Sequence, residues 1–158
     1  MFREMLRIKQ ALSLEECKEI LNTENRGVLS VMGENGYPYG MPMNHFYCEA
    51  DGCIYFHCGK KGHRLDALKG NDKVSFCVYD AGYRRPGEWA LNVKSVIVFG
   101  RMEVIDDQAL ICDICEKLSY TFPDDTVYIQ KELAQSAKNT LLLKLKPEHI
   151  SGKLVNEA

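Results

Sequence analysis

Three strand-like segments follow one another near the N-terminus with only short turns between them. They span residues 28–32, 39–47 and 54–58, and their β-branched, aromatic and alternating residues are typical of strands. Antiparallel strands can be joined by such short turns, whereas parallel strands need long crossovers. The spacing therefore predicts an antiparallel sheet. It excludes a doubly wound α/β fold, which needs regular strand–helix alternation.

The rest of the chain continues this pattern and adds helices around it. Further strands are expected at 74–79, 94–105 and 140–145, with Pro147 ending the last. A helix over 14–22 starts with the capping-box spacing of Ser13 and Glu16. Asp106 and Asp107 cap another helix that ends near Phe122 and Pro123, and a further helical piece covers 127–137. We predict a mostly β fold, a barrel of about six antiparallel strands with flanking helices, in a single domain over residues 1–158.

Composition limits the classes of partner. Of the 158 residues, 46% are hydrophobic and 27% charged, which is ordinary for a soluble globular protein. The formal net charge of -2 gives no general attraction to nucleic acid or anionic lipid, so we expect neither as a partner. No apolar run approaches the roughly 20 residues that span a bilayer. The N-terminus lacks the apolar core of a signal peptide, and a cytoplasmic location is expected.

The cysteines indicate a packing role in the core rather than a redox or metal-binding role. The chain has seven, an odd number, and most are embedded in apolar segments. In a reducing compartment such residues are small buried hydrophobes. Cys112 and Cys115 have CxxC spacing, but they lie in a helical pattern and no second pair follows at zinc spacing. No metal site is expected.

Residues 59–64 form a basic, glycine-containing turn between a strand and a short helix. Gly59 and Gly62 free the backbone to turn, and Leu65 and Leu68 then face inward before Gly70 stops the helix. Free N–H groups and the positive end of the helix dipole would face the same place as the cations of the turn. This arrangement predicts a site for the phosphate of a small ligand. The alternative, a solvated loop of charges, is equally compatible with the local sequence. The cations are Lys60, Lys61, His63 and Arg64.

Two further features stand out in the connections. Pro42 cannot donate to a ladder, so it marks an edge, a bulge or a place where something other than a strand lies alongside. Asn44 shares its face, and Met43 and His45 lie on the other. Residues 34–36, Glu-Asn-Gly, are typical of a two-residue hairpin turn. Trp89, the only tryptophan, lies in a long loop and is either functional or a packing anchor.

Three motifs in this order carry a resemblance to a known family. They are Met41-Pro42-Met43-Asn44, Tyr55-Phe56-His57 with Gly62-x-Arg64-Leu65-Asp66, and Ser95-Val96-Ile97-Val98-Phe99-Gly100. With them, nearly the whole chain resembles the pyridoxamine-phosphate-oxidase-like flavin-binding split barrels, and within them the 5-nitroimidazole-resistance (Nim-type) branch. The resemblance implies a homodimer that holds FMN, sometimes FAD, at its interface and transfers electrons through the flavin N5.

The resemblance also implies roles for particular residues. His57 would project toward the flavin as the catalytic histidine, orienting a substrate or moving protons. The alternative is a structural histidine on the barrel face, with its ring nitrogens hydrogen-bonded and no catalytic role. The Pro42 strand would lie against the isoalloxazine, with backbone groups of Met43 and Asn44 at its polar edge. The phosphate would be held by Lys60, Gly62, His63 and Arg64, and the facing subunit would complete the pocket with Trp89, Lys94, Ser95 and Val96.

The function implied is that of an FMN-dependent oxidoreductase. It would use a reduced nicotinamide or another donor to reduce a small oxidised organic substrate, such as a nitroimidazole. Two alternatives stay open at this point. One is a flavin- or haem-binding module without turnover, with His45, His57, His63 and His149 as haem contacts. The other is a vitamin B6 oxidase, which is disfavoured because Lys144, Lys146 and Lys153 are too scattered to bind a substrate phosphate.

Overall fold

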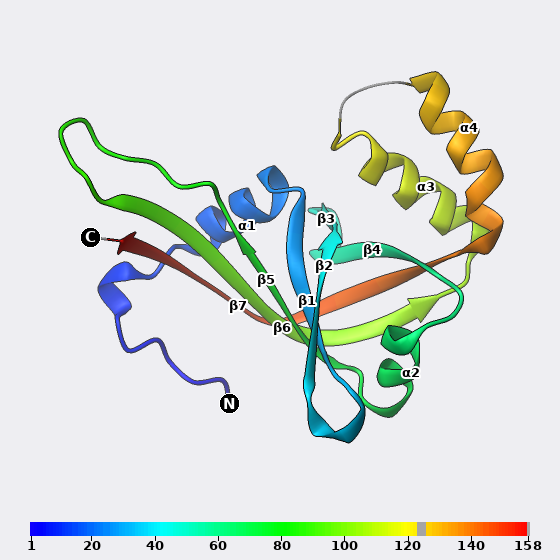
Figure 1. Cartoon of the computed structure of the whole chain (residues 1–158), viewed down its shortest axis with the longest axis horizontal. Coiled ribbons are helices and arrows are strands. Elements are labelled where there is room, and N and C mark those ends of the chain that lie inside the picture. The colour runs from blue at the N-terminus through cyan, green and yellow to red at the C-terminus, as the bar shows by residue number, and fades with distance from the viewer. Residues whose placement is uncertain (123–125, 158) are drawn as a thin grey trace.

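The computed structural model describes residues 1–122 and 126–157 and shows a curled sheet with helices at its rim (Figure 1). The α-helices are α1 (Leu14–Thr23), α2 (His63–Gly70), α3 (Gln108–Ser119) and α4 (Thr126–Ser136). Short 3-10 turns cover Ile8–Gln10, Glu34–Gly36 and Ala137–Asn139. The strands are β1 (Arg26–Met32), β2 (Pro38–Asn44), β3 (Phe46–Cys48), β4 (Cys53–Gly59), β5 (Lys73–Tyr79), β6 (Leu91–Ile105) and β7 (Thr140–Glu157).

The order of the strands explains why the sheet curls. All pairings are antiparallel, and the order across the sheet is β2-β1-β5-β6-β7-β4-β3. The two edge strands, β2 and β3, are consecutive in the chain and only His45 separates them. A flat sheet would hold its edges far apart, so this one-residue connection requires the sheet to bend until its edges meet. The predicted split barrel is therefore confirmed.

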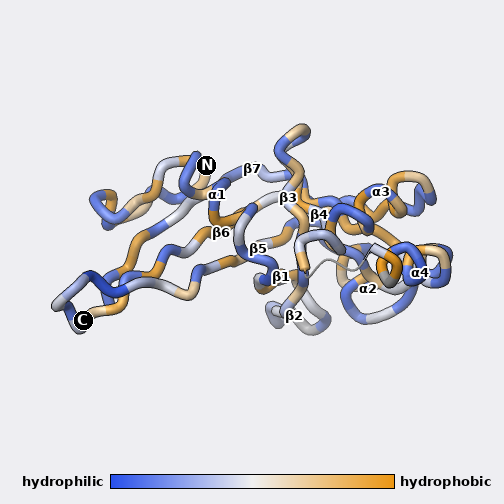
Figure 2. The backbone as a smooth tube through the Cα atoms, turned by 90° about the horizontal axis from the view of Figure 1, so that it is seen from above, coloured by the Kyte–Doolittle hydropathy of each residue, from blue (hydrophilic) through white to orange (hydrophobic). Residues whose placement is uncertain are grey.

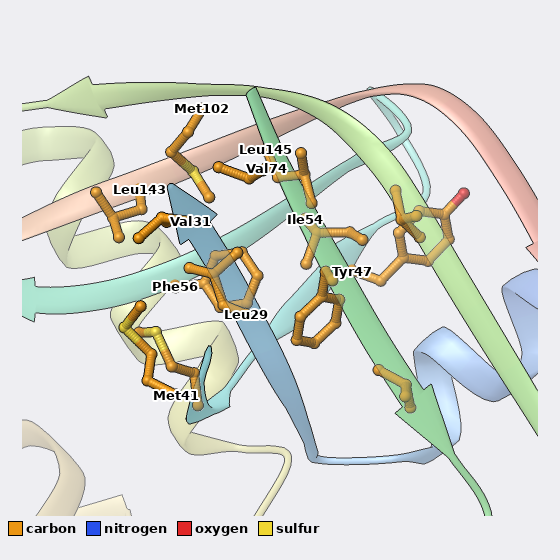
Figure 3. Packing of buried hydrophobic residues seen from close by; sticks show 14 of the residues in the cluster. Leu29, Val31, Met41, Tyr47, Ile54, Phe56, Val74, Met102, Leu143 and Leu145 are labelled. Atoms are coloured by element: carbon orange, nitrogen blue, oxygen red, sulfur yellow. The ribbon is translucent and has the colours of Figure 1, made fainter. Parts of the chain in front are cut away.

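The main core fills the inside of this curve. Leu29, Ile54, Phe56, Leu143 and Leu145 are each fully buried and point toward one another from β1, β4 and β7 (Figure 3). Burying side chains of this size stabilises the fold by about 1.5–3 kcal/mol each. The alternation that puts Ile54 and Phe56 on one face of β4 and Tyr55 on the other is as predicted.

A second, smaller core lies outside the barrel. Tyr55 and Leu142, which face outward from β4 and β7, pack with Ile111 and Ile114 of α3. Helices α2, α3 and α4 gather at one end of the molecule, away from the two termini (Figures 1 and 2). Within the described residues, no helix is both long and apolar enough to span a membrane.

Helix ends follow the predicted chemistry. Ser13 and Glu16 form the capping box of α1, with the Ser13 hydroxyl accepting from the Glu16 N–H and the Glu16 carboxylate accepting from the Ser13 N–H. Asp107 caps α3 without such a reciprocal bond: its carboxylate accepts from the Leu110 N–H at 2.8 Å. Helix α3 ends at Ser119, before the expected end at Phe122 and Pro123, and Pro123 lies outside the described residues.

The prediction of one return strand over residues 39–47 is wrong. The strand breaks at His45, which makes seven strands in the described chain rather than about six. His45 is 2% exposed and its Nε2 lies 2.9 Å from the Leu21 carbonyl oxygen. This contact with α1 turns the chain from one edge of the sheet to the other, a role that no local pattern reveals.

The end of the last strand and the β1–β2 connection also differ from the sequence-based expectation. Strand β7 does not end at Pro147 but continues to Glu157 through a bulge. The bulge is seen in the register, in which Gly100 pairs with Pro147 but Phe99 pairs with His149. Glu148 is the extra residue, and a bulge tolerates the missing proline N–H. The β1–β2 connection is longer than a two-residue hairpin: the Gly33 N–H donates to the Tyr37 carbonyl around the Glu34–Gly36 turn.

Candidate functional site

The turn between β4 and α2 presents an open helix N-terminus. Gly62 has φ +135°, a conformation that favours glycine, and α2 begins directly after it. No side chain caps this helix, and within the described residues the N–H groups of His63 and Arg64 have no acceptor. Such free N–H groups, at the positive end of a helix dipole, are suited to bind an anion.

The cations of the turn differ in how far they are neutralised. Lys60 Nζ lies 3.4 Å from Asp106 Oδ1 and forms an ion pair. Lys61 and Arg64 have no carboxylate partner in the described part of the chain. Arg64 is half-buried, and its Nη1 donates to Met43 Sδ at 3.3 Å, a weak acceptor. The turn therefore carries positive charge that the protein itself leaves uncompensated.

A cavity of about 230 Å³ lies against this turn. The His63 ring stacks on Tyr39 with centroids 4.4 Å apart, which joins α2 to strand β2 at the cavity. The structure thus brings the predicted Gly62, His63 and Arg64 together at this cavity, whereas Lys60 belongs to the same turn but does not line the cavity and pairs with Asp106. The cavity is lined by Tyr39, Cys58, Gly59, Lys61, Gly62, His63, Arg64 and Leu65.

Strand β2 is an edge strand, which is one of the three possibilities that Pro42 left open. It pairs with β1 on one side only, so its other side presents unpaired backbone groups. Pro42 is exposed, and the Asn44 side-chain oxygen accepts from Arg26 Nε at 3.0 Å. The Met43 side chain is buried in the core, so Met43 can meet a surface ligand only through its backbone.

His57 lies on the outward face of β4, at a different cavity of about 240 Å³ under the helices α3 and α4. His57 is exposed by its side-chain surface, but the surrounding protein partly desolvates the imidazole and lowers its pKa, and the nearby positive charge of Arg64 lowers it further. The imidazole is therefore neutral at pH 7 and can accept or donate a proton. Half of its neighbours in this cavity are apolar and half are polar. The apolar ones are Cys115, Leu118, Leu133 and Ala137, and the polar ones are Ser119, Glu132, Ser136 and Thr140. The catalytic role of His57 stays a prediction.

The remaining predicted residues lie away from the turn within one chain. Trp89 is 82% exposed in the long β5–β6 connection, at the end of the molecule opposite α2 (Figure 1). Lys94 Nζ pairs with Glu16 at 3.5 Å, Ser95 is half-buried, and Val96 is fully buried in the core. Their contribution to the flavin site of a facing subunit stays a prediction. Because the Val96 side chain is buried in the core, Val96 would contribute only its backbone groups.

One residue of the site, Tyr39, was missed by the sequence-based prediction. Lys61 was predicted among the cations of the phosphate turn but is not among the residues that the family resemblance assigned to the phosphate, and the Lys60–Asp106 ion pair shows that Lys61 is the freer cation. Tyr39 carries no local signal, because its stack on His63 depends on the packing of β2 against α2.

The cysteines form no bonded or metal-holding group among the described residues, and all seven are free thiols. Cys17 and Cys53 are buried, in line with a packing role, whereas Cys112 is exposed and contradicts it. Burial raises the pKa of the Cys115 thiol to about 11, with a smaller contribution from Cys112, so this thiol stays protonated.

The sequence itself matches a known family over most of its length. Residues 13–154 fit the sequence model described as pyridoxamine 5'-phosphate oxidase. The chain belongs to the pyridoxamine 5'-phosphate oxidase family. The matched range includes β2, the basic turn and β6, so the family match covers the whole candidate site. No curated protein matches the chain at a significant level.

Solved structures share the fold of this family member at low identity. A candidate 5-nitroimidazole antibiotic resistance protein of Bacteroides thetaiotaomicron is 18% identical, with 92% of this chain and 87% of that chain covered and a TM-score of 0.77. A conserved hypothetical protein of Mycobacterium tuberculosis is 16% identical, with 95% and 90% covered and a TM-score of 0.79. An FAD-binding protein of Mesorhizobium loti is 23% identical, with 92% and 97% covered and a TM-score of 0.68.

Proposed function

We propose that this protein is a flavin-dependent reductase of small oxidised organic compounds. The observation that supports this most directly is the half-buried Arg64 guanidinium, which has no carboxylate partner among the described residues and lies beside an uncapped helix N-terminus. A half-buried charge without a partner is costly unless a ligand compensates it. The flavin phosphate is the anion that family membership and the cavity together suggest.

In this proposal the phosphate accepts from the N–H groups of His63 and Arg64 and from the side chains of Lys61 and Arg64. Such charge-assisted hydrogen bonds are stronger than neutral ones. Lys60 and His63 lie at the same turn and add positive charge. The unpaired edge of β2 around Pro42 faces the ring system, where backbone groups of Met43 and Asn44 provide donors and acceptors. The bound flavin supplies the two-electron chemistry.

The cavity beside His57 is the proposed position of the substrate. Its volume of about 240 Å³ is small, and its walls are partly apolar, so it suits a compact heterocycle. His57 at its mouth is neutral at pH 7 and orients the substrate or transfers a proton to it. The structural likeness to a candidate 5-nitroimidazole resistance protein supports a nitro-heterocycle as this compound.

We further propose that the protein is a homodimer that buries the outward face of β1, β5 and β6. The cross-strand neighbours on this face are Val28, Cys77 and Ile97. The next set on the same face, two residues further along, includes Ser75 and Phe99. Val28, Ile97 and Phe99 are 39%, 38% and 39% exposed. A contiguous apolar surface of this kind is typical of an interface. In the dimer, Trp89, Lys94, Ser95 and Val96 of one copy complete the flavin site of the other.

The first test is an absorption spectrum of the purified protein, repeated after FMN or FAD has been added and the protein passed through a gel-filtration column. We expect the visible bands of oxidised flavin to stay with the protein. Anaerobic addition of a reduced nicotinamide should bleach these bands, and a nitroimidazole should restore them. A colourless protein that retains neither flavin would overturn the proposal. Bands that no donor bleaches would favour a flavin-binding module without turnover, and a Soret band would favour haem.

The dimer is tested separately by light scattering after gel filtration. The wild-type protein should have twice the 18.0 kDa mass of one chain. The substitution Ile97→Lys places a charge in the centre of the proposed interface and should give the single-chain mass. An equally exposed position on another face, Val104→Lys, should leave the dimer intact. A wild-type protein with the mass of one chain would contradict the dimer.

A further inference from the structure

The cavity of about 240 Å³ beside His57 is bounded by two helices that pack over the sheet. Its floor comes from β4 and the start of β7, and its walls are α3 and α4, which lie side by side (Figure 1). The Gln130 side chain of α4 donates to the Glu116 carboxylate of α3 at 2.7 Å and joins the two walls. Ile111 and Ile114 anchor α3 on the sheet. These contacts give the cavity its shape before a ligand enters it.

The polar groups of this cavity are mostly hydrogen-bond acceptors. The Ser119 hydroxyl donates to the Cys115 carbonyl at 2.7 Å, and the Thr140 hydroxyl donates to the Ser136 carbonyl at 2.9 Å. Each of these hydroxyl oxygens then has only lone pairs left to offer a ligand. The ionised Glu132 carboxylate accepts hydrogen bonds and donates none. A ligand that suits these groups therefore brings N–H donors.

Glu132 carries the negative charge of the cavity. It is half-buried, and among the described residues that line the cavity none is Lys or Arg. The ion pair of the neighbouring helix, between Lys117 and Asp113 at 2.7 Å, does not involve Glu132. A half-buried carboxylate that the described chain leaves without a cation favours a cationic ligand, because such a ligand compensates the charge. This preference is opposite to that of the basic turn.

Glu132 and His57 lie apart within the cavity. Glu132 comes from the α4 wall and His57 from the β4 floor. Arg64 is the charged side chain that shifts the pKa of His57, and it lowers that pKa, whereas a carboxylate close to the imidazole would raise it. The two residues can therefore contact different parts of one ligand.

We propose that this cavity selects substrates that carry a protonated amine, and that the Glu132 carboxylate binds this amine. The inference rests on the proposed function, since it takes the cavity as the substrate site. The ammonium group donates to Glu132 and to the neighbouring hydroxyl oxygens. The ring packs against Leu118 and Leu133, and the oxidised group lies at His57. The preferred substrate is thus a compact cationic nitro-heterocycle rather than a neutral one.

The proposal is tested with two probes of nearly equal size. One is a 5-nitroimidazole with an aminoethyl group on its ring nitrogen, which is cationic at pH 7, and the other is the neutral hydroxyethyl analogue. Isothermal titration calorimetry on the flavin-loaded protein, without an electron donor, measures the Kd of each probe in the absence of turnover. The wild-type protein should bind the aminoethyl probe at least about tenfold more tightly, because its hydrogen bond to Glu132 is charge-assisted at both ends.

The substitution Glu132→Gln keeps the shape of the side chain and removes its charge. It should weaken the aminoethyl probe about tenfold and leave the hydroxyethyl probe within about twofold. The matched control is Asp113→Asn, which removes the same charge from α3 at a position that does not line the cavity, and it should keep the preference. With a reduced nicotinamide present, Glu132→Gln should raise the KM of the aminoethyl probe and leave kcat unchanged, since Glu132 does not contact the reacting group.

The possible outcomes separate the amine site from the proposed function. Equal Kd values for the two probes in the wild-type protein, or a preference that persists in Glu132→Gln, would overturn the amine site. A preference lost equally in Asp113→Asn would show a general effect of charge and would overturn it too. If the aminoethyl probe binds preferentially through Glu132 but no donor reduces either probe, the amine site is supported and the proposed reductase fails.

Discussion

Arg64 Nη1 donates a hydrogen bond to Met43 Sδ across 3.3 Å, and this contact joins two motifs that are 21 residues apart. Met43 belongs to the edge strand β2, and Arg64 to the first turn of α2. A thioether sulfur is a weak acceptor, so most of the five guanidinium donors stay available to a ligand. The contact also fixes the position of the guanidinium before a ligand arrives, which lowers the entropy that binding costs.

The first prediction concerns the two unneutralised cations. Arg64→Ala and Lys61→Ala should each weaken flavin binding by about 10- to 100-fold, because each removes a charge-assisted hydrogen bond that contributes about 1.5–3 kcal/mol. Fluorescence titration of the flavin-free variants measures the change. Lys117→Ala is the control, since Lys117 lies on α3 and its side chain pairs with Asp113 at 2.7 Å.

Lys60 provides a sharper comparison within the same turn. Because its ammonium already pairs with Asp106, Lys60→Ala should weaken flavin binding less than Lys61→Ala does. The reverse order would show that the phosphate lies on the Lys60 side of the turn and that the assignment above is wrong.

The second prediction concerns the pKa of His57. Partial desolvation and the positive charge of Arg64 both lower it, so Arg64→Ala should raise it, while desolvation keeps it below the ordinary value. An NMR titration of the His57 ring protons, assigned with His57→Gln, measures the shift. An unchanged His57 pKa in Arg64→Ala would show that the two side chains are not coupled and that His57 is separate from the phosphate turn.

The third prediction is a loss of stability at acid pH caused by His45. Its ring is buried, its Nε2 bonds to the Leu21 carbonyl oxygen, and its Nδ1 has no partner in the described chain. Burial lowers its pKa in the folded protein, partly opposed by that hydrogen bond. The unfolded chain therefore takes up the proton first, near pH 6.5, and the free energy of unfolding falls as the pH decreases from there. The slope from this one group is at most about 1.4 kcal/mol per pH unit.

Urea unfolding between pH 7.5 and 5 measures this effect. His57 also has a lowered pKa and contributes in the same direction, so the wild-type protein must be compared with His45→Gln. We expect the variant to be less stable at pH 7.5 but to lose less stability on acidification. Parallel pH curves for the two proteins would contradict the role assigned to His45.

The fourth prediction concerns Gly100 at the β6–β7 bulge. A Cβ atom there would collide with the Lys146 backbone carbonyl, so Gly100→Ala should destabilise the fold by about 1–3 kcal/mol. Gly70→Ala is the matched control, because a Cβ at Gly70 meets no atom within 4 Å. There the helix propensity of alanine should leave stability unchanged or raise it by up to about 1 kcal/mol. The urea midpoints of the two variants measure the difference, and equal midpoints would contradict the close approach at the bulge.

Features that depend on neighbours in the chain were predictable from the sequence alone. The Ser13–Glu16 capping box and the two faces of β4 follow from local spacing, and the structure confirms them. The basic turn and its helix N-terminus were predictable for the same reason. Pro42 left an edge, a bulge and a neighbour other than a strand open, and only the order of the sheet shows that its strand is an edge. The break at His45 was not predictable, because it depends on a contact with the Leu21 carbonyl of α1.

The sequence by itself determined an antiparallel sheet, its helix starts and a cationic glycine turn, because hydrogen-bond capping, side-chain alternation and backbone freedom act over a few residues. Only the tertiary structure decided which cations of that turn stay free. Lys60 is neutralised by Asp106, 46 residues further along the chain, and Arg64 meets Met43 across the barrel edge. Electrostatic pairing depends on distance in space, and that distance is set by the register and curvature of the whole sheet.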